Sequence, residues 1–150
     1  IAYQVGHPHQ ALELLTTAAE IDRFNPVFHA DLAEILRALG KTDEAIAACQ
    51  RALELNPNLA DVHKCLGHLR RSQQDLDGAI ACFREAVRLA PEHAAAHAAL
   101  GMALRSAGQL TEAQGLMERA VQLAPDEANH YQGLGVCLYD LGKRVEAVAC

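Results

Sequence analysis

The sequence has few aromatic side chains: they make up 4% of its 150 residues, and tryptophan is absent. Alanine and leucine supply most of the apolar content, which favours closely packed helices over a β-sandwich. Basic residues are fewer than acidic ones, and the formal net charge is −6. Because a general nucleic-acid binder needs a net basic surface to displace counterions, the composition argues against that class of protein.

The motifs of disulfide frameworks and zinc ribbons are missing as well. The cysteines are odd in number and form no CxxC; they are Cys49, Cys65, Cys82, Cys137 and Cys150. This usage predicts reduced, apolar packing positions and a cytoplasmic location, with Cys65 and Cys150 the most accessible thiols. No membrane-spanning run or signal peptide is evident, and we expect the natural N-terminus to lie upstream of Ile1.

Catalytic signatures are also absent, because the sequence contains no GxSxG, HExxH, P-loop or GxGxxG. Ser72 and Ser106 are the only serines, and each follows an arginine and not a base. His93 and His97 have the i, i+4 spacing of a zinc-binding pair, but no third ligand stands at a fixed offset. The sequence therefore predicts no enzyme activity, no cofactor and no metal.

What the sequence does contain is a repeat of 34 residues. Small side chains recur at this interval where two helices must approach closely, and prolines recur where a helix must stop. The main columns are Ala45, Ala79 and Ala113; Ala52, Ala86 and Ala120; Leu32, Leu66, Leu100 and Leu134; and Pro57, Pro91 and Pro125. A period of this length is typical of stacked helix pairs.

The turns inside each pair follow the same register. We expect a residue at positive φ at the end of each first helix, where Gly6, Gly40, Gly108 and Gly142 stand. Gln74 occupies this place in one unit. The slot after the turn predicts side-chain caps for the second helices, from Asp43, Asp77 and Thr111.

These columns, with their Leu-Gly, Ala, Ala and Pro positions, resemble the tetratricopeptide repeat (TPR) family over the whole chain. The resemblance implies an all-α fold, a right-handed α-solenoid of antiparallel helix pairs in one continuous domain. It divides the chain into a partial repeat at 1–25 (the end of a first helix plus a second helix), repeats at 26–59, 60–93 and 94–127, and a truncated repeat at 128–150.

Some positions depart from the family pattern. The first aromatic slot holds His29, His63 and His97, and we expect each imidazole to bond a neighbouring carbonyl. In the second complete unit, Gln74 replaces the turn glycine and Arg70 stands in a packing slot. We therefore expect this unit to be the least stable.

In this family the first helices line a concave groove that binds other proteins. The resemblance therefore implies a protein–protein interaction scaffold that holds a partner segment, with no nucleic-acid or membrane partner. The polar and large groove positions are Glu34, Arg37, Asp61, Lys64, His68, Arg71, Met102, Arg105, Asn129 and Gln132. The slots of the lysine–asparagine clamp that some members use are mostly filled by other residue types here.

Arg37, Arg71 and Arg105 recur at the period of the array. Such a ladder of guanidinium groups would suit an acidic peptide. Alternatively, the arginines are helix formers whose stems cover the leucines beneath them and whose charge suits a helix C-terminus. Both readings remain open at this point.

Two further expectations concern the rest of the protein. The array is either a scaffold in its own right or the substrate-docking portion of a larger enzyme, such as a glycosyl-, methyl- or sulfotransferase. Copies are also expected to associate end to end, because a repeat buries its apolar face only against a neighbour. The residues behind this expectation are Leu12, Leu14, Leu15, Ile21, Leu134, Leu138, Val145 and Val148.

Overall fold

The computed structural model describes residues 8–142, and these form eight α-helices without a strand. The helices are α1 (Pro8–Ile21), α2 (Pro26–Ala38), α3 (Thr42–Leu55), α4 (Ala60–Ser72), α5 (Leu76–Leu89), α6 (Ala94–Ser106), α7 (Leu110–Leu123) and α8 (Ala128–Asp140). First helices (α2, α4, α6, α8) have 13 residues and second helices (α1, α3, α5, α7) have 14. The predicted all-α solenoid of helix pairs is confirmed.

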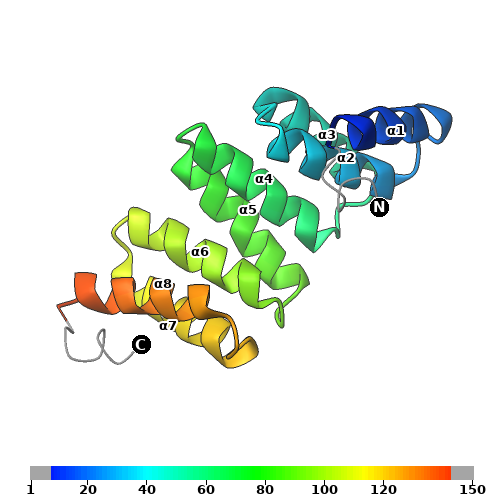
Figure 1. The fold of residues 1–150 in the computed structure, drawn as a ribbon. Coiled ribbons are helices and arrows are strands. Elements are labelled where there is room, and N and C mark those ends of the chain that lie inside the picture. Colours follow the sequence, from blue (N-terminus) through cyan, green and yellow to red (C-terminus); the bar gives the residue numbers. More distant parts are fainter. Residues whose placement is uncertain (1–7, 143–150) are drawn as a thin grey trace.

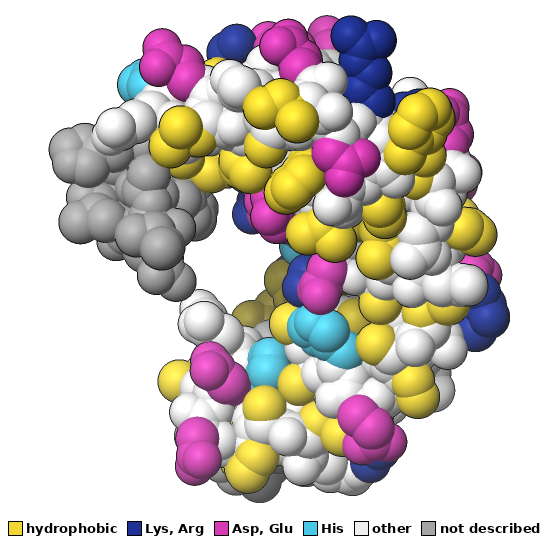
Figure 2. Space-filling view, turned by 90° about the vertical axis from the view of Figure 1, so that its right-hand side faces the viewer, with side chains coloured by type: hydrophobic (Ala, Val, Ile, Leu, Met, Phe, Trp, Pro, Cys, Tyr) yellow, Lys and Arg dark blue, Asp and Glu magenta, His cyan; other side chains and the backbone are white. Residues whose placement is uncertain are grey.

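The helix pairs stack in sequence order, from α1 at one end to α8 at the other (Figure 1). Each helix packs against its neighbours along the chain, and each first helix also contacts the first helix of the next pair. The backbones of the described second helices approach one another less closely, and α5 and α7 are joined by an ion pair between Arg84 and Glu112 at 3.3 Å. The first helices therefore lie on the inside of the curve, and Figure 2 shows the chain bending around a hollow.

The stacking depends on small side chains at the contacts between helices. The alanines that recur every 34 residues on α3, α5 and α7, such as Ala79 and Ala86, are fully buried. At Gly67 on α4, an added Cβ would lie 2.5 Å from the ring of Phe83 on α5. Because Phe83 is itself completely buried, α4 and α5 can approach this closely only with glycine at that position.

The turns between paired helices adopt the predicted conformation. Gly40, Gly108 and Gly142 have φ values of 72°, 78° and 77°. Gln74 occupies the same place with φ 65°, the one non-glycine residue at positive φ among those described. Gly6 lies outside the described residues. The second helices α3, α5 and α7 end two residues before their prolines, as expected.

The predicted caps of the second helices are wrong. The N-cap residues of α3, α5 and α7 are Lys41, Asp75 and Gln109, and only the Asp75 side chain accepts a capping bond, from the N–H of Gly78. Asp43 and Asp77 lie two residues after the N-caps, in the first turn, where their charge still suits the positive end of the helix dipole. The N-cap of each of these helices lies two residues before the position that the repeat pattern suggested.

The histidines of the first aromatic slot behave as predicted. The Nε2 atoms of His29, His63 and His97 lie 3.1, 3.0 and 2.8 Å from the carbonyl oxygens of Arg23, Pro57 and Pro91. Since a carbonyl only accepts, Nε2 carries the proton in each ring. This bond ties α2, α4 and α6 to the loops that precede them.

The second complete unit contains the expected irregularities. The half-buried Arg70 reaches out of its packing slot to Asp75, with 3.4 Å between Nη1 and the carboxylate. The charge of Arg70 thus meets the N-cap residue of α5.

We expect Gln74→Gly to raise the free energy of unfolding by about 1 kcal/mol, because glycine adopts positive φ without the steric cost that glutamine bears. Chemical denaturation of both proteins measures the difference. Gly108→Ala is the matched control at the equivalent turn, where φ is 78°, and should destabilise the array. An unchanged or lower stability of Gln74→Gly would contradict the strain assigned to this turn.

Candidate peptide-binding groove

A cavity of about 650 Å³ opens on the concave face between three first helices, and we call it the groove cavity. One wall is α4, the floor is α6 and the other wall is α8. Its lining residues are Lys64, His68 and Arg71; Ala95, Ala98, Ala99 and Met102; Asn129, His130, Gln132, Gly133 and Val136; and Met117 from α7.

Six of the groove residues predicted from the sequence line this cavity: Lys64, His68, Arg71, Met102, Asn129 and Gln132. The other four, Glu34, Arg37, Asp61 and Arg105, lie outside its lining. Their places on the first helices agree with the family pattern, but the cavity starts at α4 and not at α2.

Sequence reasoning missed Met117, which belongs to a second helix and is 1% exposed. Its side chain reaches toward the groove because Gly101 and Gly133 carry no Cβ: added Cβ atoms would lie 3.2 Å and 2.9 Å from it. Glycine in these two slots was the available signal. Together with Met102, Met117 supplies an adaptable sulfur-containing surface.

The three arginines of the ladder differ in their partners. Arg37 forms an ion pair with Glu34 at 2.8 Å, and Arg105 forms one with Asp140 at 2.7 Å. Arg71 is exposed and has no carboxylate partner within the described part of the chain. Only one of the three guanidinium groups is therefore unpaired at the groove.

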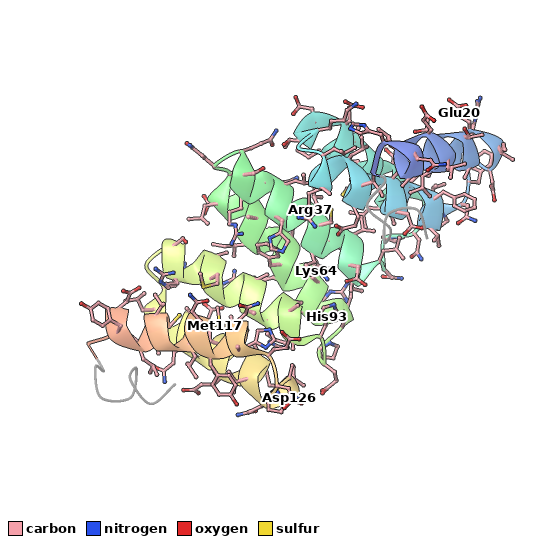
Figure 3. The ribbon with its side chains drawn as sticks, viewed as in Figure 1. Glu20, Arg37, Lys64, His93, Met117 and Asp126 are labelled. Carbon is pink, nitrogen blue, oxygen red and sulfur yellow. The ribbon has the colours of Figure 1, made fainter. Side chains whose placement is uncertain are left out.

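Lys64 takes part in a small polar cluster that joins two units. Its Nζ lies 2.7 Å from Oδ1 of Asp61 and 3.3 Å from Nε2 of His93, and His93 lies 3.2 Å from the same oxygen (Figure 3). The Lys64 ammonium lowers the pKa of the Asp61 carboxyl below its usual value. The cluster links α4 to the loop before α6.

His68 occupies the middle of the α4 wall and packs edge-on against the ring of Phe83, with 5.0 Å between centroids. Burial, reinforced by the nearby charges of Arg71, Arg37 and Lys64, lowers the pKa of His68 to about 4. The imidazole is therefore neutral near pH 7 and adds a polar, uncharged surface to the groove.

The α8 wall presents two amides. Asn129 and Gln132 are exposed, and neither side chain makes a hydrogen bond with another described residue. Between the walls, Ala95 and Ala98 leave the floor shallow and apolar. Such a surface can accept an apolar side chain while the amides bond the backbone of a bound segment.

The four described cysteines are buried, which confirms the packing positions predicted for Cys49, Cys82 and Cys137. The expectation that Cys65 is accessible is wrong, since it is 1% exposed. A hydrogen bond with Cys49 and burial raise the pKa of the Cys65 thiol, which makes it unreactive. The repeat pattern places Cys65 beside the groove positions of α4. In the structure its side chain faces α3, where it contacts Cys49. Cys150 lies outside the described residues.

The two histidines with zinc-like spacing have separate bonds. His97 donates to Pro91, whereas His93 contacts Asp61 and Lys64. Among residues 8–142, no three His, Cys, Asp or Glu side chains gather in a metal-binding arrangement. No described helix is long and apolar enough to cross a membrane.

Comparison with known proteins agrees with the helix-pair architecture. Two family models described as tetratricopeptide repeat match the sequence, one over residues 2–69 and the other over 66–128 and 99–149. The chain therefore belongs to the tetratricopeptide repeat family. No curated protein matches the sequence.

Several solved structures share this fold. MamA 41-end from Desulfovibrio magneticus RS-1 is 25% identical, with a TM-score of 0.87 over 99% of this chain and 84% of that one. YrrB, described as a TPR protein with an unusual peptide-binding site, is 25% identical, with a TM-score of 0.83 over 93% and 72%. PilF from Pseudomonas aeruginosa is 23% identical, with a TM-score of 0.88 over 99% and 68%.

The lowered pKa of His68 predicts an acid-sensitive groove. Between pH 6.5 and about 4 the unfolded chain binds more protons at His68 than the native chain, so this residue makes stability fall as the pH drops. In His68→Leu, which can still pack on Phe83, the loss of stability across this window should be smaller. Denaturation at a series of pH values measures it. Parallel pH profiles for the two proteins would contradict the assignment.

Proposed function

We propose that the chain is a protein-interaction scaffold whose groove cavity holds a segment of a partner protein. The observation that carries this proposal is a concave cavity in which Arg71, Asn129 and Gln132 have no partners among the described side chains. Polar groups without internal partners, placed above an apolar floor, are the features of a recognition site.

The rest of the surface offers less for recognition. The second helices use their apolar faces for packing, and their exposed charges mostly pair with one another, as Arg88 does with Glu85. The likeness of the fold to YrrB, a TPR protein described as having a peptide-binding site, supports a peptide segment as the occupant.

The bound segment carries at least one acidic group. Arg71 and Lys64 lie on one wall, and no carboxylate lines the groove cavity. With one unpaired arginine and one lysine shared with Asp61, the electrostatic attraction is modest. A short peptide should bind with micromolar affinity, near −8 kcal/mol or weaker.

Filling the floor of the groove should abolish peptide binding. Ala95 is exposed at the groove, so Ala95→Trp can place an indole in the cavity without disturbing the core. For peptides selected from a random library against the unmodified chain, we expect at least about a tenfold loss of affinity, measured by calorimetry.

Gly115→Trp on α7 is the matched control, because Gly115 is exposed and an added Cβ there meets open space. This variant should bind the same peptides with unchanged affinity, and both variants should melt near the parent temperature. Equal binding by Ala95→Trp and Gly115→Trp would show that the peptides bind elsewhere.

Association between copies is a separate prediction. On α1, Leu14 is 60% exposed and Ile21 is 81% exposed, so apolar surface is available there. Leu134 and Leu138 were expected to lack neighbours, but they are buried in the core; Val145 and Val148 lie outside the described residues. We expect concentration-dependent association in sedimentation experiments, reduced in a Leu14→Lys, Ile21→Lys variant. A monomer at every concentration would contradict it.

A further inference from the structure

A second cavity, of about 820 Å³, opens beside the groove cavity at the loops that precede α6 and α8, and we call it the loop cavity. Its lining residues are Ala90, Pro91, Glu92, His93, Ala94, Ala95, Ala124, Glu127, Asn129 and His130. Ala95, Asn129 and His130 line both cavities. The two cavities therefore adjoin along the first helices, and we call the two together the channel.

Charge is divided between the two parts of this channel. The lining of the groove cavity includes Lys64, His68 and Arg71 but no Asp or Glu. The lining of the loop cavity includes Glu92 and Glu127 but no Lys or Arg. A bound segment would meet positive potential at one end and negative potential at the other.

One charge in each part has no ion-pair partner within residues 8–142. Arg71 is the unpaired cation of the groove cavity. Glu127 is the unpaired anion of the loop cavity: it is the N-cap residue of α8, but its side chain makes no capping bond. Glu92 is already paired with Arg119 at 3.1 Å. Arg71 and Glu127 are thus the two charges left for a ligand.

The junction of the two parts carries polar groups instead of charges. His130 is 8% exposed, its Nδ1 is buried without a hydrogen-bond partner among the described residues, and the ring lines both cavities. Asn129 stands beside it. On the floor, Ala95 and Met102 lie about 10 Å apart along α6, which corresponds to about three residues of extended chain.

From this arrangement we propose that the channel selects a charge-segregated partner segment and holds it in one direction. The acidic end of the segment lies against Arg71 and Lys64 on α4, an apolar side chain rests between Ala95 and Met102, and the basic end lies against Glu127. A uniformly acidic segment meets repulsion at Glu127, and a uniformly basic one meets it at Arg71. This inference rests on the proposed function and adds the charge pattern and direction of the partner.

Two peptides of identical composition test the proposal. In the segregated peptide, acidic residues, an apolar centre and basic residues follow one another; in the mixed peptide, the acidic and basic residues alternate around the same centre. At low salt the segregated peptide should bind about fivefold tighter, the effect expected of two exposed ion pairs. The advantage should shrink at high salt, because exposed charges are screened.

Variants that remove one charge test which end of the peptide binds at Arg71 and which at Glu127. Arg71→Gln and Glu127→Gln should each remove part of the advantage of the segregated peptide, and the double variant should bind both peptides equally. Arg88→Gln and Glu85→Gln, which remove an exposed ion pair from α5, are the matched controls and should leave the advantage unchanged.

A nitroxide label gives the direction directly. Attached to the acidic end of the segregated peptide, it should broaden the amide resonances around Arg71; attached to the basic end, it should broaden those around Glu127. Broadening at the opposite ends, or equal broadening from both labels, would overturn the proposed direction.

The outcomes separate this inference from the proposed function. If both peptides bind equally and perturb groove resonances, the charge selection is wrong and the groove remains a peptide site. If neither peptide perturbs groove resonances at millimolar concentration, both the inference and the proposed function are wrong.

Discussion

The close contact between each first helix and its second helix is the constraint on which the remaining structure depends. Gly67 shows it most clearly, because the ring of Phe83 occupies the space that a Cβ would need. The buried alanines of α3, α5 and α7 meet the same requirement in the three pairs that the structure describes in full. Neighbouring first helices approach one another more closely than neighbouring second helices do, and this difference curves the stack and makes its inner face concave.

The groove is lined mainly by positions of α4, α6 and α8 that do not pack against a paired helix. Positions facing a paired helix must be small or apolar, whereas those facing the hollow of Figure 2 are free to be polar. Glycine lets one packed side chain reach the groove. At Gly133, the missing Cβ leaves room for the buried Met117 to contribute to the floor. The same small-residue packing thus determines both the curvature and the chemistry of the groove floor.

Departures from the repeat are accommodated locally. Gln74 adopts the turn conformation at positive φ. Arg70 leaves its packing slot to reach Asp75, the one N-cap among those of α3, α5 and α7 whose side chain bonds the backbone. The histidines that replace aromatic residues each gain a carbonyl acceptor in the preceding loop. Each departure is matched by a contact within the same unit or the loop before it, so the register of the array is preserved.

The sequence by itself determined the helices, their order, their turns and the face that carries Lys64, His68 and Arg71, because a 34-residue period records contacts that recur identically in every unit. Only the tertiary structure decided which arginines are paired. Arg37 and Arg105 occupy equivalent slots, yet their partners, Glu34 and Asp140, come from different positions in the repeat. The burial of Cys65 and the division of charge between the two cavities also depend on neighbouring units. Such features arise where units differ, and periodicity carries no information about those differences.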